Sequence, residues 1–216
     1  MIVQPHFSVA PWAVTEEALD LTMLAQSESV LALSNGHIGL RANLDEGEPY
    51  GMPGTYLNAF YEVRPLPYAE AGYGYPEDGQ TVVNVTNGKL IRLLVDDEPF
   101  DVRYGELVSH RRTLDLRAGV LRREVHWRSP AGREIEVRSV RLVSFVHRSV
   151  AAIRYEVKPL DGETRIVVQS ELVANEDVPA RSEDPRAAAI LASPLVSESH
   201  GSVHSRPSGL PSAGSK

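Results

Sequence analysis

The sequence predicts an all-β fold, and three features of its 216 residues lead to this prediction. Several stretches alternate apolar and polar residues with a period of two, which is the pattern of a strand that buries one face. These stretches are short, and turn-forming residues separate them at close spacing, as in β-sandwiches and β-barrels. Evidence for helices is thin, because the apolar positions of residues 15–24 fit a helix or a strand equally well.

The clearest predicted strand spans residues 151–157. Its even positions include two charged residues, so the segment fits an antiparallel strand with one buried face. That face comprises the odd positions Ala151, Ile153, Tyr155 and Val157. A further strand is predicted at residues 165–173, directly after a glycine-containing turn.

Two hairpins are predicted earlier in the chain. Residues 91–102 alternate, break at an acidic turn and resume, which indicates a strand, a turn and a strand. Residues 125–137 form a second hairpin around Ser-Pro-Ala-Gly at 129–132, a sequence suited to a tight connection. After residue 137 the apolar residues move from odd to even positions. We therefore predict a β-bulge at Arg138–Ser139 that re-aims the strand.

The stretch LALSNGHIGLR, residues 31–41, places Asn35–Gly36 between two apolar runs. Asn-Gly favours a type I′ turn, in which both central residues have positive φ. With this turn, Leu33 pairs with Ile38 in a hairpin. The predicted apolar face of the hairpin comprises Leu31, Leu33, Ile38 and Leu40.

Composition places the chain among ordinary globular proteins, with 42% hydrophobic and 24% charged residues. The net charge is −7 and basic residues form no separate run, so we expect no nucleic-acid partner. No segment approaches the roughly 18 apolar residues of a membrane span, and the N-terminus does not resemble a signal peptide. Cysteine is absent, which excludes disulfides and thiolate chemistry. We expect a cytoplasmic protein without a membrane partner.

Ionisable side chains give no strong candidate for catalysis. Of the seven histidines, only His200 and His204 have a spacing typical of metal ligands, and they lie in a Ser/Gly/Pro-rich stretch without a companion acid, so no metal site is predicted. The acidic clusters all fall in predicted turns, where solvated carboxylates are expected, and we assign none of them to acid/base catalysis. These clusters are Asp45/Glu46/Glu48, Glu77/Asp78, Asp96/Asp97/Glu98 and Glu183/Asp184.

Three blocks of sequence resemble one known family. They are ESVLALSNGHIGLRANLDEGEPYGMPGTYLNAFYE, YGELVSHRRTLDLRAGVLRREVHWRSPAGREIEVRSVRLVS and AAIRYEVKPL. In this order they resemble the N-terminal domain of glycoside hydrolase family 65, which includes maltose, trehalose and kojibiose phosphorylases and related hydrolases. The resemblance extends from about Phe7 to Val196. It implies a large antiparallel β-sandwich (super-sandwich, galactose-mutarotase-like), and we expect this sandwich to be incomplete.

The resemblance also implies where the chemistry occurs. In the family, a glutamic acid of a following (α/α)6 barrel protonates the glycosidic oxygen, and phosphate or water attacks with inversion. We expect this chain to end before that barrel, so it has no catalytic residue and no cofactor, although inorganic phosphate is the co-substrate of full-length phosphorylases. The implied partners are a disaccharide, through the missing domain, and a second subunit in a homodimer. Candidate substrate-binding residues that would face the barrel are His37, Arg41, Thr55, Tyr56 and Asn58.

The expected domain organisation is a partial β-sandwich at 1–199 and a disordered Ser/Gly/Pro-rich tail at 200–216. The change of composition near His200 is what a frameshift or sequencing break would produce. The leading hypothesis is therefore a non-catalytic N-terminal domain of an inverting α-glucoside phosphorylase or hydrolase, inactive by itself. A stand-alone carbohydrate-binding module and a dimerisation module are the alternatives. The sequence leaves open the disaccharide and the choice between phosphate and water.

Overall fold

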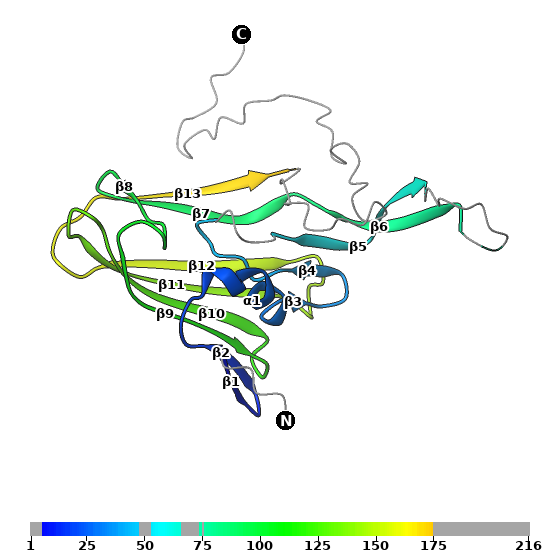
Figure 1. The fold of residues 1–216 in the computed structure, drawn as a ribbon, viewed down its shortest axis with the longest axis horizontal. Helices are drawn as coiled ribbons and strands as arrows, with labels where there is room; N and C mark the ends of the chain where they lie inside the picture. The colour runs from blue at the N-terminus through cyan, green and yellow to red at the C-terminus, as the bar shows by residue number, and fades with distance from the viewer. Residues whose placement is uncertain (1–5, 48–52, 66–73, 75, 175–216) are drawn as a thin grey trace, which may run out of the picture.

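The computed structural model describes residues 6–47, 53–65, 74 and 76–174, and these residues form an antiparallel β-sandwich (Figure 1). The larger sheet has six strands in the order β1-β2-β9-β10-β11-β12, and short connections join its neighbouring strands in three places. The strands are β1 (Phe7–Ala10), β2 (Ala13–Glu16), β9 (Glu106–Asp115), β10 (Val120–Arg128), β11 (Glu134–Val143) and β12 (Ala151–Pro159).

Two smaller sheets form the opposite layer. One has the order β13-β7-β8 and the other the order β3-β4-β5-β6. Figure 1 shows β7 and β13 lying across from β9–β12, with β5 and β6 extending outward beyond the larger sheet. The prediction of an all-β sandwich is confirmed. The bounds are β3 (Leu33–Ser34), β4 (Ile38–Leu40), β5 (Thr55–Pro65), β6 (Asp78–Asn84), β7 (Asn87–Val95), β8 (Glu98–Pro99) and β13 (Ile166–Val173).

Helical structure in the described residues is confined to one short segment before β3. A 3₁₀ turn, η1 (Leu21–Met23), leads into α1 (Leu24–Val30). Asp20 caps the turn, because its side chain accepts a hydrogen bond of 2.9 Å from the backbone N–H of Thr22. The segment 15–24, ambiguous in the sequence, thus ends a strand and begins a helix. No helix in the described residues is long and apolar enough to cross a membrane.

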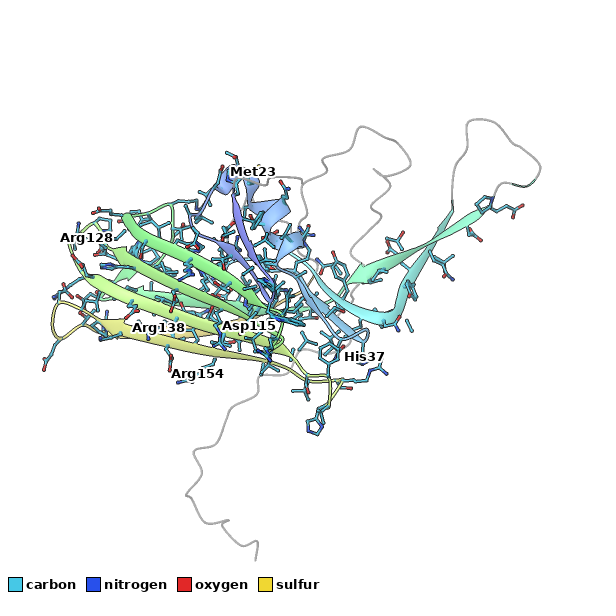
Figure 2. All side chains as sticks on the ribbon, turned by 90° about the horizontal axis from the view of Figure 1, so that it is seen from below. Met23, His37, Asp115, Arg128, Arg138 and Arg154 are labelled. Atoms are coloured by element: carbon cyan, nitrogen blue, oxygen red, sulfur yellow. The ribbon has the colours of Figure 1, made fainter. Side chains whose placement is uncertain are left out.

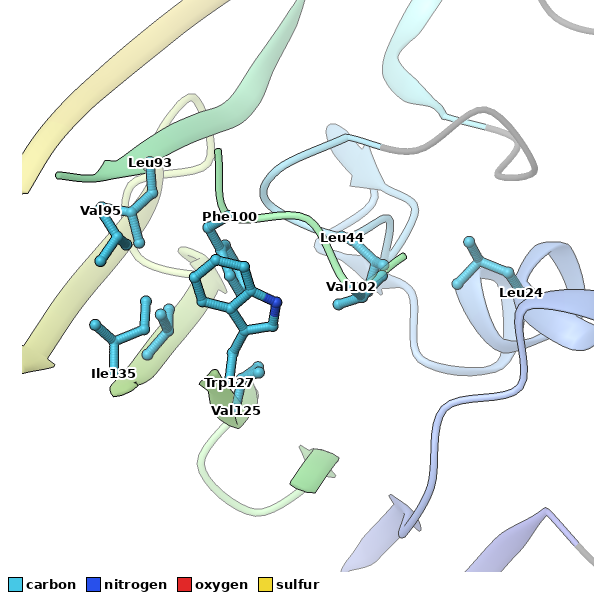
Figure 3. Close-up of a cluster of buried hydrophobic side chains, with 10 residues drawn as sticks. Leu24, Leu44, Leu93, Val95, Phe100, Val102, Val125, Trp127 and Ile135 are labelled. Atoms are coloured by element: carbon cyan, nitrogen blue, oxygen red, sulfur yellow. The ribbon is translucent and has the colours of Figure 1, made fainter. Parts of the chain in front are cut away.

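The hydrophobic core lies between the two layers and surrounds Trp127 on β10 (Figure 3). The indole is fully buried and meets the ring of Phe100 edge-on at 5.5 Å. Its Nε1 donates a hydrogen bond of 2.6 Å to the carbonyl of Tyr104, so the single polar atom of this side chain is satisfied. The predicted strand faces contribute here, and the surrounding buried residues include Leu24, Leu44, Leu93, Val95, Val102, Val125, Ile135 and Val137.

The predicted bulge at Arg138–Ser139 is wrong. β11 pairs without interruption with both β10 and β12 across these residues. The buried face simply continues through Ser139 and Arg141, two polar residues that the apolar pattern alone could not assign to the interior. The register shift in this part of the sheet lies instead on β10, between His126 and Trp127, opposite β9.

The hairpin at Asn35–Gly36 is present with a different register. Leu33 pairs with Leu40 rather than Ile38, so four residues form the turn and only Gly36 of the two predicted central residues has positive φ. The Asn35 side chain explains the wider turn, because its Oδ1 accepts hydrogen bonds from the N–H groups of His37 and Ile38 at 2.9 and 2.8 Å. A shift of two residues keeps each side chain on its face. The predicted apolar face of Leu31, Leu33, Ile38 and Leu40 is therefore buried as expected.

The two tryptophans give a matched test of this core. Trp127→Ala should lower the free energy of unfolding by about 3–5 kcal/mol, because it removes the largest buried side chain and leaves a cavity. Trp12→Ala should change it by less than about 0.5 kcal/mol, because Trp12 is largely exposed. Urea denaturation followed by far-ultraviolet circular dichroism measures both, and equal losses would contradict this core.

Candidate functional site

A cluster of buried charges joins the segment 42–47 to the inner face of the larger sheet. Asp45 and Glu46 are 0% and 4% exposed. Arg123 on β10 contacts both carboxylates: its guanidinium donates to Glu46 at 2.5 and 2.7 Å and to Asp45 at 3.1 Å. Arg141 on β11 donates to Asp45 Oδ1 at 2.5 and 3.1 Å, and the Ser139 hydroxyl donates to Asp45 Oδ2 at 2.8 Å.

Strand alternation places these polar residues inside the sandwich. On β10, Leu121, Arg123, Val125 and Trp127 share the buried face, so Arg123 occupies a position that periodicity assigns to the core. Its guanidinium also lies 5.8 Å from the centre of the Phe100 ring, a favourable cation–π contact. The charges therefore lie beside the hydrophobic core, at the point where the segment 42–47 crosses the sheet.

The electrostatics of the cluster keep its carboxylates ionised. Burial by itself would raise the pKa of Asp45, but the positive charges of Arg141 and Arg123 and the hydrogen bonds outweigh burial and lower this pKa below the usual 3.8. Burial raises the pKa of the nearby Tyr155 hydroxyl, as do the charges of Asp45 and Glu46. These carboxylates are suited to holding two arginines, because neither is in a state to donate a proton near neutral pH.

His110 on β9 continues the cluster as a neutral acceptor. Its Nε2 accepts a hydrogen bond of 3.1 Å from Nε of Arg123. Burial lowers the pKa of His110 to about 2, and repulsion from Arg123 and Arg112 adds to this effect. An imidazole that stays neutral at physiological pH can receive this hydrogen bond but contributes no charge.

A second buried ion pair fastens the start of the same segment. Arg112 on β9 forms a two-pronged contact with Glu16 on β2, at 2.6 and 3.0 Å. Its remaining Nη1 donates to the carbonyl of Ala42 at 2.8 Å. Both side chains are almost completely buried. Three arginines from adjacent strands thus hold residues 42–46 against the sheet.

The expectation that Asp45 and Glu46 are solvated turn residues is wrong. They follow an apolar stretch and resemble loop acids in sequence, but the sheet supplies a buried arginine for each. The arginines themselves were missed because charged residues at core-facing positions are rare unless paired. Their signal is the unbroken odd-numbered phase from Leu121 to Trp127. Glu48 and the cluster Glu183/Asp184 lie outside the described residues.

The structure brings together three of the five candidate substrate-binding residues. His37, Tyr56 and Asn58 line one shallow hollow of about 240 Å³ at the base of the β5–β6 hairpin. The backbone N–H of Asn58 donates to the carbonyl of His37 at 2.8 Å, which fixes the two segments side by side. Figure 2 shows His37 near the end of the larger sheet.

Arg41 and Thr55 have other surroundings. The Arg41 guanidinium donates to the hydroxyl of Ser29 at 2.8 Å and to the carbonyl of Ala25 at 2.7 Å, and it lies 3.5 Å from the Glu28 carboxylate. The Thr55 hydroxyl accepts a hydrogen bond of 2.6 Å from Nζ of Lys89. These two residues join the segment around β4 and β5 to α1 and β7. Within the described residues, no group of three His, Cys, Asp or Glu side chains could hold a metal ion.

Breaking the central ion pair should destabilise the fold strongly. Arg141→Met keeps the apolar stem but leaves the Asp45 carboxylate with less compensation, so we expect a loss of about 3–5 kcal/mol in the free energy of unfolding. Arg154→Met is the matched control on the next strand, where the pair with Glu156 is exposed and should contribute less than about 1 kcal/mol. Urea denaturation compares the two, and similar losses would show that the buried cluster has no special role.

The low pKa of His110 predicts a pH dependence with a definite sign. From pH 6.5 down to about 2, the unfolded chain binds a proton at this residue and the folded chain does not, so stability falls as the pH falls. Between pH 7 and pH 5 the loss from this group is about 2 kcal/mol. His110→Gln retains an acceptor for Arg123 and should remove this loss, whereas the exposed control His147→Gln should retain it. Denaturation curves at the two pH values decide, and an unchanged loss in His110→Gln would contradict the assignment.

Comparisons with known proteins agree on one family. A family model described as "Glycosyl hydrolase family 65, N-terminal domain" matches residues 14–210. An uncharacterised glycosyl hydrolase of Mycobacterium tuberculosis is 68% identical over 200 residues, which cover 93% of this chain and 25% of the relative. The α,α-trehalose phosphorylase of Thermoanaerobacter brockii is 34% identical over 85% of this chain and 24% of its own length.

A solved structure supports the same relationship. A human-microbiome protein that carries the name of a kojibiose phosphorylase superposes with a TM-score of 0.71 at 25% identity, over 79% of this chain and 23% of the other. The chain therefore spans about a quarter of the length of these relatives. The sandwich, the matched residues and these relatives together show that the chain belongs to glycosyl hydrolase family 65, as its N-terminal domain.

Proposed function

We propose that this chain is the non-catalytic part of an enzyme that cleaves an α-glucosidic disaccharide with inversion, and that it has no activity by itself. The relatives named as trehalose, maltose and kojibiose phosphorylases support a disaccharide substrate, with inorganic phosphate as co-substrate. The more similar mycobacterial relatives are named glycosyl hydrolases, so water remains the alternative nucleophile. A cytoplasmic location and a homodimer remain part of this proposal.

One observation supports a scaffold role above the others: the buried acids are committed to arginines. Inverting cleavage needs a protonated acid and an activated nucleophile on opposite faces of the sugar ring. The Asp45 and Glu46 carboxylates face Arg123 and Arg141 at 2.5–3.1 Å inside the sandwich, where no sugar can reach them. Their role in this proposal is to hold residues 42–47, so that the chain on either side is presented in a fixed geometry.

The five candidate substrate-binding residues have a graded place in this proposal. His37, Tyr56 and Asn58 line a hollow open to solvent, so they can contact a neighbouring surface or a sugar. Arg41 and Thr55 would act through the backbone that they hold. The hollow is also the observation that favours the alternative of a stand-alone carbohydrate-binding module, because Tyr56 and Tyr61 both line it and tyrosines commonly contact sugars.

The proposal predicts that the purified chain releases neither glucose 1-phosphate nor glucose from trehalose, maltose or kojibiose in the presence of phosphate. The reason is the commitment of its buried carboxylates to ion pairs. Coupled enzymatic assays for both products measure this, with the Thermoanaerobacter brockii trehalose phosphorylase as the positive control. Turnover of any of the three sugars by the chain alone would overturn the proposal.

A binding measurement separates the scaffold from the carbohydrate-binding module. Calorimetric titration with the same three sugars should give no heat of binding. Saturable binding that is lost in Tyr56→Ala but retained in the exposed control Tyr104→Ala would favour the module instead.

A further inference from the structure

The larger sheet presents three of its connections at one end. The β1–β2 turn, the β9–β10 turn and the β11–β12 loop all lie there, because Ala13 pairs with Asp115, Val120 with Leu142, and Val143 with Ala151. Figure 2 shows Asp115 and His37 toward this end and Arg128 at the other. The β3–β4 turn joins the same end through the Asn35 side chain, whose Nδ2 donates to the carbonyl of Ser144 at 2.6 Å.

These connections expose large apolar side chains. Each of the three contributes at least one, and together they form what we call the apolar end face, defined as Trp12, Leu116, Phe145 and Val146. The exposed fractions are 60%, 52%, 72% and 85% in that order. Leaving a Phe or Val side chain in water rather than burying it forgoes about 1.5–3 kcal/mol, so a row of four at one end of a sheet calls for an explanation.

The loops that carry these side chains are internally braced. In the β11–β12 loop, the N–H of Ser144 donates to the carbonyl of Val150 at 2.9 Å and the N–H of Val150 to that of His147 at 2.8 Å. Asn35 adds a second hydrogen bond of 3.0 Å to the carbonyl of Arg148. The β1–β2 and β9–β10 turns are linked in turn, because the N–H of Leu116 donates to the carbonyl of Trp12 at 2.9 Å. A surface fixed before contact loses less conformational entropy on binding.

The opposite end of the sheet has a different character. There the β10–β11 connection exposes Pro130, Ala131 and Gly132, and Arg133 forms an ion pair with Asp96 at 2.9 Å. Small and paired polar residues are the ordinary composition of a solvated hairpin end. The apolar side chains of the braced loops are thus concentrated at one end rather than scattered, which distinguishes them from single exposed hydrophobic residues.

We propose that the apolar end face docks the part of a family 65 polypeptide that lies beyond the quarter matched by this chain. The relatives support this occupant, because three quarters of their length lies outside the match and the matched domain must be joined to it. Six strands about 4.8 Å apart make this end about 25 Å wide, which suits a protein surface and is larger than a disaccharide needs. The inference rests on the proposed function, because it assumes that this chain belongs to a longer enzyme.

Cysteine accessibility tests the proposal directly, because the natural chain contains no cysteine. Single variants V146C and L116C probe the apolar end face, and A131C is the matched control at the other end. Each is measured in the chain alone and in a chimera in which this chain replaces the matched quarter of the Mycobacterium tuberculosis relative. The rate of alkylation of each introduced thiol is followed by mass spectrometry of its peptide. In the chimera we expect V146C and L116C to react about tenfold more slowly or less, with A131C unchanged, because a packed interface excludes solvent and reagent.

The outcomes separate this inference from the proposed function. A cooperatively unfolding chimera in which V146C and L116C still react rapidly would overturn the docking site and leave the proposed function standing. A chimera that protects both thiols but cleaves no α-glucoside would support the docking site and count against the proposed function. Protection of V146C in the chain alone that increases with its concentration would identify a second copy as the occupant and overturn the proposal.

A second experiment applies if the chimera aggregates. This chain and the remaining three quarters of the relative are then co-expressed as separate polypeptides, with an affinity tag on this chain alone. The wild-type chain and the control A131S should retain the partner through purification, and the double variant F145S/V146S should lose it. Failure of the wild-type chain to retain the partner, or retention by F145S/V146S, would overturn the proposal.

Discussion

The contact on which the rest of the structure depends is the one between Asp45, Glu46 and the arginines of the larger sheet. An ion pair in the interior must recover the large cost of removing charge from water, and it does so only with several well-formed hydrogen bonds. Here Arg123 and Arg141 contribute five such bonds to two carboxylates, and Ser139 a sixth. This arrangement fixes one crossing of the chain over the sheet, since no apolar residue at position 45 could satisfy the arginines. The cluster therefore specifies the path of the segment 42–47 as well as its stability.

The fold could be predicted from the sequence because period-two alternation is a local property. Each strand from β7 to β13 buries one face, and the residues of that face were readable from the order of apolar and polar letters. The bulge at Arg138–Ser139 failed for a related reason. Val140 and Leu142 suggested a change of phase, whereas Ser139 and Arg141 occupy the inner face and meet Asp45, a partner almost a hundred residues earlier in the chain. Pattern alone cannot identify a polar residue as buried when its partner is so remote.

The turn at Asn35–Gly36 shows the same limit at short range. A two-residue turn is the ordinary choice for Asn-Gly, but the Asn35 side chain here accepts from two backbone N–H groups and donates to two carbonyls of the β11–β12 loop. The added tertiary bonds favour the wider turn over the local preference. Because the register moved by two residues, the apolar face survived and only the pairing changed. The candidate site divided in a similar way: His37, Tyr56 and Asn58 came together, whereas Arg41 and Thr55 joined contacts that the sequence did not reveal.

The two ends of the sandwich suggest how such a domain can serve a larger enzyme without chemistry of its own. The buried charges lie in the interior and cannot reach a partner, so they act by keeping the sheet and the segment 42–47 in one geometry. The exposed apolar side chains lie at the end of that sheet, on loops braced by backbone hydrogen bonds and by Asn35. Rigidity in the interior and apolar surface at the end belong together, because a docking surface that must be ordered on contact binds more weakly than one already in place. A buried ionic cluster thus contributes to assembly at a distance, through the strands β10 and β11 that carry its arginines at one position and the exposed loops at their ends.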